Sequence, residues 1–215
     1  MEKEIQEQFT DYSKTAYSLA IYPNRGEFQA AGLPTKGLFY VCLKLMGECG
    51  EFSEKIGKCI RDNSGVIDNE RKAALLLELG DVLWYVNALC VEFGKKFAEQ
   101  IDKSLKYPVM DLNNFMEKKW PKGGGASIER WLFICHTLGF NSSEIAKRVQ
   151  LYDRSHPTYD PEEYNIFQCV HQIIAAIAIS ANLIGSDILW VANKNLEKLT
   201  SRKERGKLQG SGDDR

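Results

Sequence analysis

Apolar residues recur at helical spacing along most of the chain, most clearly in two neighbouring segments. In residues 38–60 an apolar stripe consists of Leu38, Cys42, Leu45, Cys49, Phe52, Ile56 and Cys59. In residues 70–93 a second stripe consists of Leu75, Leu79, Val82, Val86, Cys90 and Phe93. Positions three and four apart share one face of an α-helix, so both segments are predicted to be helices with one buried face.

The rest of the chain shows the same helical period, so we expect an all-α fold. Helices are predicted at residues 4–20, about 95–106, 127–152 with a break at 139–142, 162–183 and 187–203. Asp68 or Asn69 is expected to cap the helix at 70–93, and Ser186 the last one. The short connection at 61–67 predicts that the two striped helices pack antiparallel.

Two pairs of acids lie one row away from the apolar stripes. Glu48 and Glu51 belong to the first striped helix, and Glu78 and Asp81 belong to the second. Each pair is three residues apart and therefore shares a face. If the stripes pack together, the four carboxylates converge, and they repel one another unless they are protonated or bridged by a cation. A hard divalent ion such as Mg²⁺ suits such oxygen ligands.

Glycines lie next to these acids inside the predicted helices. Gly47 and Gly50 flank Glu48, and Gly80 precedes Asp81. A glycine inside a helix costs about 1 kcal/mol relative to alanine, but it permits close approach of another backbone or a ligand. One acid pair alone would indicate only a solvated helix face. Two such pairs with adjacent glycines favour a binding site.

The spacing of the acids resembles that of a known family. The sequence Gly-Glu-Cys-Gly-Glu ending at Glu51 is followed, after 26 residues, by Glu-Leu-Gly-Asp-Val-Leu-Trp-Tyr starting at Glu78. This arrangement resembles the MazG-like, all-α nucleoside triphosphate pyrophosphohydrolases, a superfamily that includes the dimeric dUTPases and the dCTP pyrophosphatases. The resemblance implies a helical bundle and Mg²⁺-dependent cleavage, with Mn²⁺ as a substitute, of a nucleoside triphosphate to monophosphate and pyrophosphate.

The resemblance also implies roles for the acids. Glu48, Glu51, Glu78 and Asp81 are expected to bind the metal. A carboxylate that is not fully engaged by metal can accept a proton from water. Glu51 is the preferred base and Glu48 is the alternative.

The last predicted helix carries a polar and basic face. Asn195, Lys198 and Arg202 are three and four residues apart and share one side of the helix. An amide, an ammonium and a guanidinium suit a phosphate chain. The sequence Asn-Leu-Glu-Lys-Leu-x-x-Arg resembles the last helix of the same family, where these positions meet the substrate.

Three further residues are weaker candidates for substrate binding. Tyr85 follows Asp81 by one turn and is expected either to contact the sugar or base or to belong to the core. Lys58 and Arg61 lie near the 61–67 connection, where they either contact phosphate or form solvated surface charge.

The segment between the second acid helix and the last helix is long. About 90 residues intervene, whereas compact members of the family connect the two within a dozen. We therefore expect one domain over 1–215 with a helical insertion at about 94–185, before the last helix. The histidines lie in this stretch, and none forms the Glu-x-x-His pairs of di-iron bundles near the acids, which argues against iron.

Composition restricts the partners and the compartment. With 28 basic and 29 acidic residues the formal charge is −1, so no bulk field favours nucleic acid. We find no run of about 18 apolar residues and no signal peptide, and therefore expect no membrane partner. The six cysteines form no C-x-x-C pair and are expected to be reduced, as in a cytoplasmic protein. The resemblance implies a homodimer or homotetramer. A non-catalytic helical nucleotide-binding or regulatory module is the alternative function.

Overall fold

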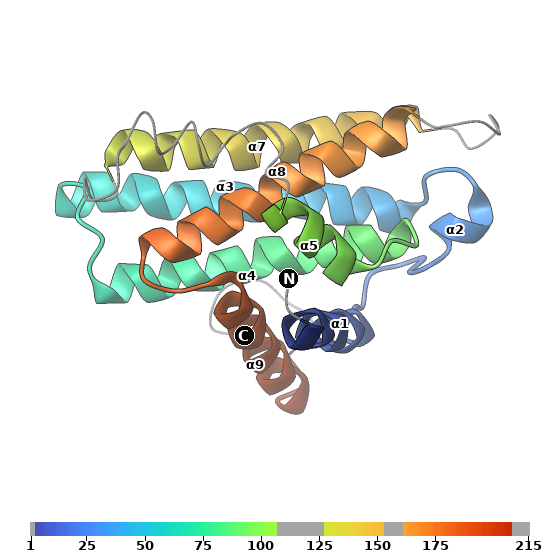
Figure 1. The fold of residues 1–215 in the computed structure, drawn as a ribbon, viewed down its shortest axis with the longest axis horizontal. Helices are drawn as coiled ribbons and strands as arrows, with labels where there is room; N and C mark the ends of the chain where they lie inside the picture. The colour runs from blue at the N-terminus through green and yellow to red at the C-terminus, as the bar shows by residue number, and fades with distance from the viewer. Residues whose placement is uncertain (1–2, 107–126, 153–160, 208–215) are drawn as a thin grey trace.

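The computed structural model describes residues 3–106, 127–152 and 161–207, and these residues form helices and no strands (Figure 1). The helices are α1 (Lys3–Ser18), α2 (Phe28–Ala31), α3 (Lys36–Asn63), α4 (Asn69–Glu92), α5 (Phe97–Lys106), α7 (Ile128–Leu151), α8 (Pro161–Leu183) and α9 (Ile188–Glu204). The predicted all-α fold is confirmed.

Four long helices, α3, α4, α7 and α8, enclose most of the core. α3 runs antiparallel to α4, α7 packs on α3, and α8 contacts both α7 and α4 (Figure 1). Every residue of the two predicted apolar stripes is buried. The hydrophobic period therefore identified both the helices and the faces by which they pack, and the predicted antiparallel hairpin of α3 and α4 is confirmed.

Helix boundaries agree with the predictions in one case and differ in two. Asp68 caps α4, because its side chain accepts a hydrogen bond from the backbone N–H of Arg71. The expected cap of α9 at Ser186 is wrong: Asp187 accepts from the N–H of Trp190 at 2.8 Å, and a carboxylate also suits the positive end of a helix. The expected break at 139–142 is wrong too, because α7 is continuous there.

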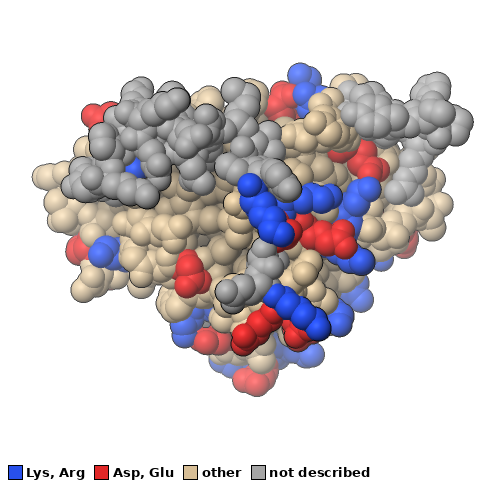
Figure 2. Space-filling model, viewed as in Figure 1, with Lys and Arg blue, Asp and Glu red and all other residues tan. Residues whose placement is uncertain are grey.

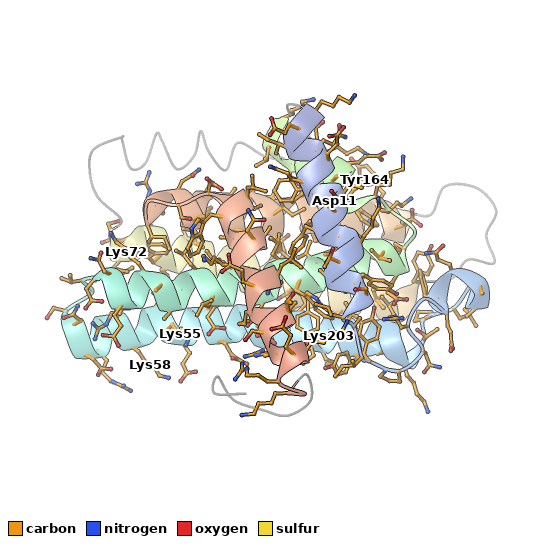
Figure 3. All side chains as sticks on the ribbon, turned by 90° about the horizontal axis from the view of Figure 1, so that it is seen from below. Asp11, Lys55, Lys58, Lys72, Tyr164 and Lys203 are labelled. Atoms are coloured by element: carbon orange, nitrogen blue, oxygen red, sulfur yellow. The ribbon has the colours of Figure 1, made fainter. Side chains whose placement is uncertain are left out.

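Helices α1 and α9 lie side by side across α4, as Figure 3 shows from below. The indole Nε1 of Trp84 on α4 donates to the backbone oxygen of Ala16 on α1 at 3.2 Å. Residues from the first and last helices are thereby placed beside the middle of α4, where Asp81 lies.

A buried carboxylate fixes the segment after α1 on the C-terminal end of α4. Glu92 has no exposed surface. One of its oxygens accepts hydrogen bonds from the hydroxyls of Tyr17 (2.9 Å) and Tyr22 (2.6 Å) and from the backbone N–H of Gly26 (3.0 Å). Burial raises the pKa of Tyr17 to about 12, so its hydroxyl remains a donor at neutral pH. We call these four residues the Glu92 clasp.

Two helical stretches, Asn69–Glu92 and Glu163–Leu183, are long and apolar enough to cross a membrane by length and composition, although polar residues interrupt both and neither is a continuous apolar run. In each helix, 72% of the most apolar 18-residue stretch is buried inside the protein. Core helices of soluble proteins are often equally long and apolar. On the face drawn in Figure 2, acidic and basic side chains are intermixed, in keeping with the balanced composition.

Candidate active site

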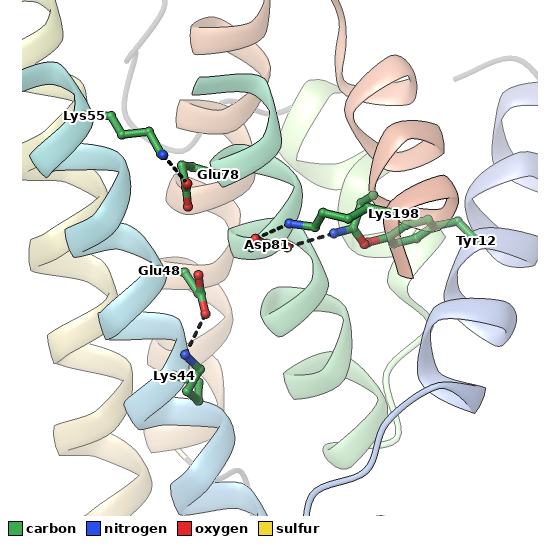
Figure 4. A network of polar contacts seen from close by, with 8 residues as sticks. Tyr12, Lys44, Glu48, Lys55, Glu78, Asp81 and Lys198 are labelled. Carbon is green, nitrogen blue, oxygen red and sulfur yellow. Dashed lines mark hydrogen bonds and ion pairs between the residues drawn. The ribbon is translucent and has the colours of Figure 1, made fainter. Parts of the chain in front are cut away.

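Three of the four predicted acids meet between α3 and α4. One carboxylate oxygen from each of Glu48, Glu78 and Asp81 lies within 4.8 Å of the other two (Figure 4). Glu48 and Glu78 are only 7% and 4% exposed, and Asp81 is half-buried. The antiparallel packing of the hairpin brings three of the acids together, whereas the sequence predicted that all four would converge. We call these three residues the acid cluster.

Glu51, the fourth predicted acid, lies beside the acid cluster but outside it. Its side chain is exposed on α3, one turn after Glu48. Its negative charge still contributes to raising the pKa of both Glu48 and Glu78. Glu51 is therefore close enough to act on the cluster by its charge, while its side chain is exposed to solvent.

Each acid of the cluster is paired with a lysine. The ammonium of Lys44 lies 2.8 Å from Oε1 of Glu48, and that of Lys55 lies 3.0 Å from Oε1 of Glu78 (Figure 4). The ammonium of Lys198, from α9, binds Oδ2 of Asp81. Lysines thus approach the cluster from α3 and from α9.

The pKa values of the buried acids reflect two opposing effects, burial and the paired lysines. Burial raises the pKa of Glu48 above its ordinary value; the hydrogen bond from Lys44 opposes this, and the charge of Asp81 adds to it. Burial likewise raises the pKa of Glu78, against the opposing effect of Lys55. For Lys44, burial would lower the pKa, but the hydrogen bond and charge of Glu48 outweigh it and raise the pKa overall.

Helix α9 reaches the cluster through Asp81. The side-chain amide of Asn195 donates to Oδ1 of Asp81 at 3.2 Å, and the hydroxyl of Tyr12 on α1 donates to Oδ1 of Asn195 at 3.1 Å. A Cβ placed on Gly80 would lie only 3.1 Å from the Cβ of Asn195. The glycine before Asp81 is therefore required for this close approach of α9 to α4.

The predicted basic face of α9 lies only partly at the cluster. Asn195 and Lys198 both bind Asp81. Arg202, one turn beyond Lys198, is 8% exposed. By its spacing it shares a helix face with Lys198.

Tyr85 is half-buried at the edge of the site. The ammonium of Lys44 lies 5.8 Å from the centroid of its ring, and the rings of Trp84 and Tyr40 lie at 4.6 and 6.4 Å. Its ring therefore belongs to an aromatic group that borders the acid cluster, and both predicted roles, substrate contact and core packing, are compatible with this position.

Lys58 and Arg61 do not join the acid cluster in the described structure. Lys58 pairs with Glu54, and Arg61 with Asp62, all on α3 and mostly exposed. Figure 3 shows Lys58 beyond Lys55 along α3, farther from α9. Their predicted contact with phosphate therefore receives no support from the geometry, and solvated surface charge, the alternative, describes them as they stand.

Three contributors to the site were not predicted: Tyr12, Lys44 and Lys55. Lys44 pairs locally with Glu48, one turn later on α3. Tyr12 gave no signal, because it lies within the apolar stripe of α1, where an aromatic residue is expected as core. Lys55 follows Glu51 by one turn, so local spacing favours a pair with Glu51. The structure pairs Lys55 with Glu78 across the hairpin instead.

The acid cluster fits a hard divalent cation. Two oxygens bound to one Mg²⁺ are at most about 4.2 Å apart, twice the Mg–O distance of about 2.1 Å. The observed limit of 4.8 Å therefore needs only small side-chain rotations. The donors are all carboxylate oxygens, which Mg²⁺ and Mn²⁺ prefer.

The comparisons with known proteins agree with this geometry. Residues 40–106 match the model of the MazG nucleotide pyrophosphohydrolase domain. The acid-bearing hairpin is MazG-like. The "Gene 37 protein" of Mycobacterium phage L5 is 44% identical over 78 residues, which cover 36% of this chain and 65% of that protein. The chain thus spans slightly less than two thirds of the length of this curated relative. No solved structure matches the chain.

The MazG-like segment contains the whole acid cluster, together with Lys44, Lys55 and Tyr85. It excludes Tyr12 and the α9 residues that bind Asp81. The predicted resemblance to the MazG-like pyrophosphohydrolases is confirmed for residues 40–106. The extent of the insertion, about 94–185, stays a prediction.

Proposed function

We propose that this protein is a Mg²⁺-dependent pyrophosphohydrolase that cleaves a nucleoside triphosphate to a monophosphate and pyrophosphate. The observation that carries the proposal is the convergence of oxygens from Glu48, Glu78 and Asp81 within 4.8 Å inside a MazG-like segment. Phosphoanhydride cleavage requires neutralised phosphate charge and a positioned water, and both requirements are met by a carboxylate cluster that holds a divalent ion.

The residues of the site divide into those that hold the ion and those that act on water. Glu48, Glu78 and Asp81 would hold Mg²⁺, which when bound neutralises phosphoryl oxygens and lowers the pKa of water. Glu51 is exposed beside the cluster, so its carboxylate is available to accept the proton of the attacking water. Glu48 is the alternative base, but its oxygen is already bound by Lys44.

The substrate would extend from the cluster toward α9. Lys198 and Arg202 supply positive charge for the departing pyrophosphate, and the amide of Asn195 orients an oxygen at the same end. Tyr85 borders the cluster beside Lys44, and its ring would offer a flat surface to the sugar or base.

Product analysis tests the proposal directly. The protein is incubated with Mg²⁺ and a panel of ribo- and deoxynucleoside triphosphates, and the products are separated by ion-exchange chromatography. Monophosphate and pyrophosphate should appear together in equal amounts. Diphosphate with orthophosphate as the first products would contradict the proposal, and nucleotide binding without turnover would indicate the non-catalytic module instead.

A matched pair of variants tests the base. Glu51→Gln should reduce turnover by about 10² or more, the usual contribution of a general base. Glu54→Gln, an equally conservative change one turn away at an exposed residue that pairs with Lys58, should leave turnover within about twofold of wild type. Equal activity of the two variants would remove Glu51 from the mechanism.

We also propose that the protein acts in the cytoplasm as a homodimer or homotetramer. Large apolar side chains are exposed on α3 and α7, including Leu43 at 67% and Leu132 at 68%, and such surfaces suit contacts between subunits. Light scattering after size-exclusion chromatography should give a mass of two or four chains, and a monomer at micromolar concentration would contradict this.

A further inference from the structure

The acid cluster is balanced by three ammonium groups. Lys44, Lys55 and Lys198 each bind one acid of the cluster, so the six formal charges sum to zero. The lysines approach from different sides, two along α3 and one from α9 (Figure 4). Their side chains are 36%, 26% and 18% exposed, so all three ammoniums are partly withdrawn from water.

The three acids are not equally engaged by these partners. Lys44 binds Oε1 of Glu48, and Lys55 binds Oε1 of Glu78. Both oxygens of Asp81 are bound from α9, Oδ1 by the amide of Asn195 and Oδ2 by Lys198. A cation that approaches Asp81 therefore competes with Lys198 more directly than with either of the other lysines.

We propose that Lys44, Lys55 and Lys198 change partners when substrate binds, from the carboxylates of the cluster to the phosphate oxygens of the nucleotide, so that metal and nucleotide bind cooperatively. This inference rests on the proposed function. It adds Lys44 and Lys55 to the phosphate-binding residues, and it makes Lys198 the residue that links occupancy of Asp81 to α9.

Charge balance is the physical reason for the cooperativity. A divalent cation alone would add two positive charges to a partly buried site whose three acids are each already paired with a lysine, which low local polarity makes unfavourable. A phosphate chain alone would meet three carboxylates. When both arrive together, the cation neutralises the carboxylates and the released ammoniums neutralise the phosphates. The flexible four-carbon stem of lysine permits this change of partner without movement of a helix.

Calorimetry on the full-length protein measures the coupling. Mn²⁺ is titrated alone, and then with a deoxynucleoside α,β-imidotriphosphate, which cannot be cleaved at the proposed bond. Analogues that carry each of the four common DNA bases, and one that carries uracil, are tested in turn. Metal ions also bind such analogues in solution, so that equilibrium is measured separately and subtracted. The contribution of a lysine to the coupling is then the coupling free energy of wild type minus that of the variant that lacks the lysine.

The variant Lys198→Met should bind Mn²⁺ alone more tightly than wild type, but with weaker coupling between Mn²⁺ and the analogue. Mn²⁺ alone should bind about tenfold more tightly, because a competing cation has been removed. The coupling between Mn²⁺ and the analogue should fall by about tenfold, within the usual range for linked sites. Lys194→Met is the matched control: Lys194 lies one turn earlier on α9 and pairs with Glu197 at the surface, so both affinities should stay at wild-type values.

The outcomes separate the inference from the proposed function. If wild type binds neither Mn²⁺ nor any analogue, the proposed function fails and the inference falls with it. If both ligands bind but Lys198→Met leaves the coupling unchanged, or weakens both affinities together, the inference is wrong and the function stands. Lys44→Met provides a second test in case Lys198→Met does not fold. It removes a lysine that is 36% exposed. Like Lys198→Met, it should tighten the binding of Mn²⁺ alone and weaken the coupling between Mn²⁺ and the analogue.

Discussion

The contact between Gly80 and Asn195 predicts that one added methyl group will disturb both stability and the site. In Gly80→Ala the new Cβ would lie 3.1 Å from the Cβ of Asn195 and 3.4 Å from its Nδ2. Carbon atoms in good contact are about 3.5–4.0 Å apart. Because the Cβ of Asn195 is fixed to the backbone, α9 must recede by about half an ångström or more.

The expected cost follows from three terms. Overpacking costs about 1–3 kcal/mol, and replacing glycine by alanine inside a helix returns about 1 kcal/mol. Recession of α9 also lengthens the 3.2 Å bond between Asn195 and Asp81 beyond hydrogen-bonding range, a loss of about 1 kcal/mol. The net destabilisation should be about 1–3 kcal/mol.

Gly57→Ala is the matched control, because a Cβ at Gly57 on α3 meets no atom within 4 Å. This variant should be stabilised by up to about 1 kcal/mol. Urea unfolding followed by far-UV circular dichroism measures both changes. If Gly80→Ala is stabilised as much as Gly57→Ala, α9 does not lie against α4 as described, and the contacts of Asn195 and Lys198 with Asp81 lose their basis.

Three further predictions test the polar groups. Metal-free Glu78→Gln should be at least as stable as wild type at neutral pH, because burial raises the pKa of Glu78 and so disfavours its ionised form in the folded state. This difference in stability between variant and wild type should vanish as the pH falls below the ordinary carboxyl pKa of 4.5. Thermal melts of the variant should show no stabilisation by Mg²⁺. Burial lowers the pKa of His171 to about 4, so wild type should lose stability, by up to about 3 kcal/mol, as the pH falls from about 6.5 to 4, whereas urea unfolding of His171→Gln should not show this loss. Tyr12→Phe leaves Oδ1 of Asn195 without its donor and should cost about 1 kcal/mol in the same urea assay.

The sequence was sufficient for the hairpin because its information there is local. Apolar spacing within α3 and α4 identified the buried faces, and all the predicted stripe residues are buried. The spacing of Glu48, Glu78 and Asp81 relative to these faces then placed them at one level of an antiparallel pair. Both steps depend only on the helical period and on a short connection.

The rest of the site depends on contacts between residues far apart in the sequence, which spacing cannot predict. Tyr12 and Asn195 are separated by 183 positions. Lys55 has a local acidic neighbour in Glu51, yet it binds Glu78 on the other helix. The glycine pattern was informative only in part: Gly80 is explained by the approach of α9, whereas a Cβ at Gly47 or Gly50 would meet no atom within 4 Å.

The Glu92 clasp limits how far the matched segment can be treated as an exchangeable module. Glu92 lies within residues 40–106, but its donors, Tyr17, Tyr22 and Gly26, precede that segment. An excised or transplanted segment would therefore contain a carboxylate built for burial with none of its hydrogen-bond donors, and such a group costs several kcal/mol to bury. A chimaera that inherits this hairpin must also inherit the Tyr17–Gly26 segment, so exchange between relatives has to include sequence beyond the recognisable motif.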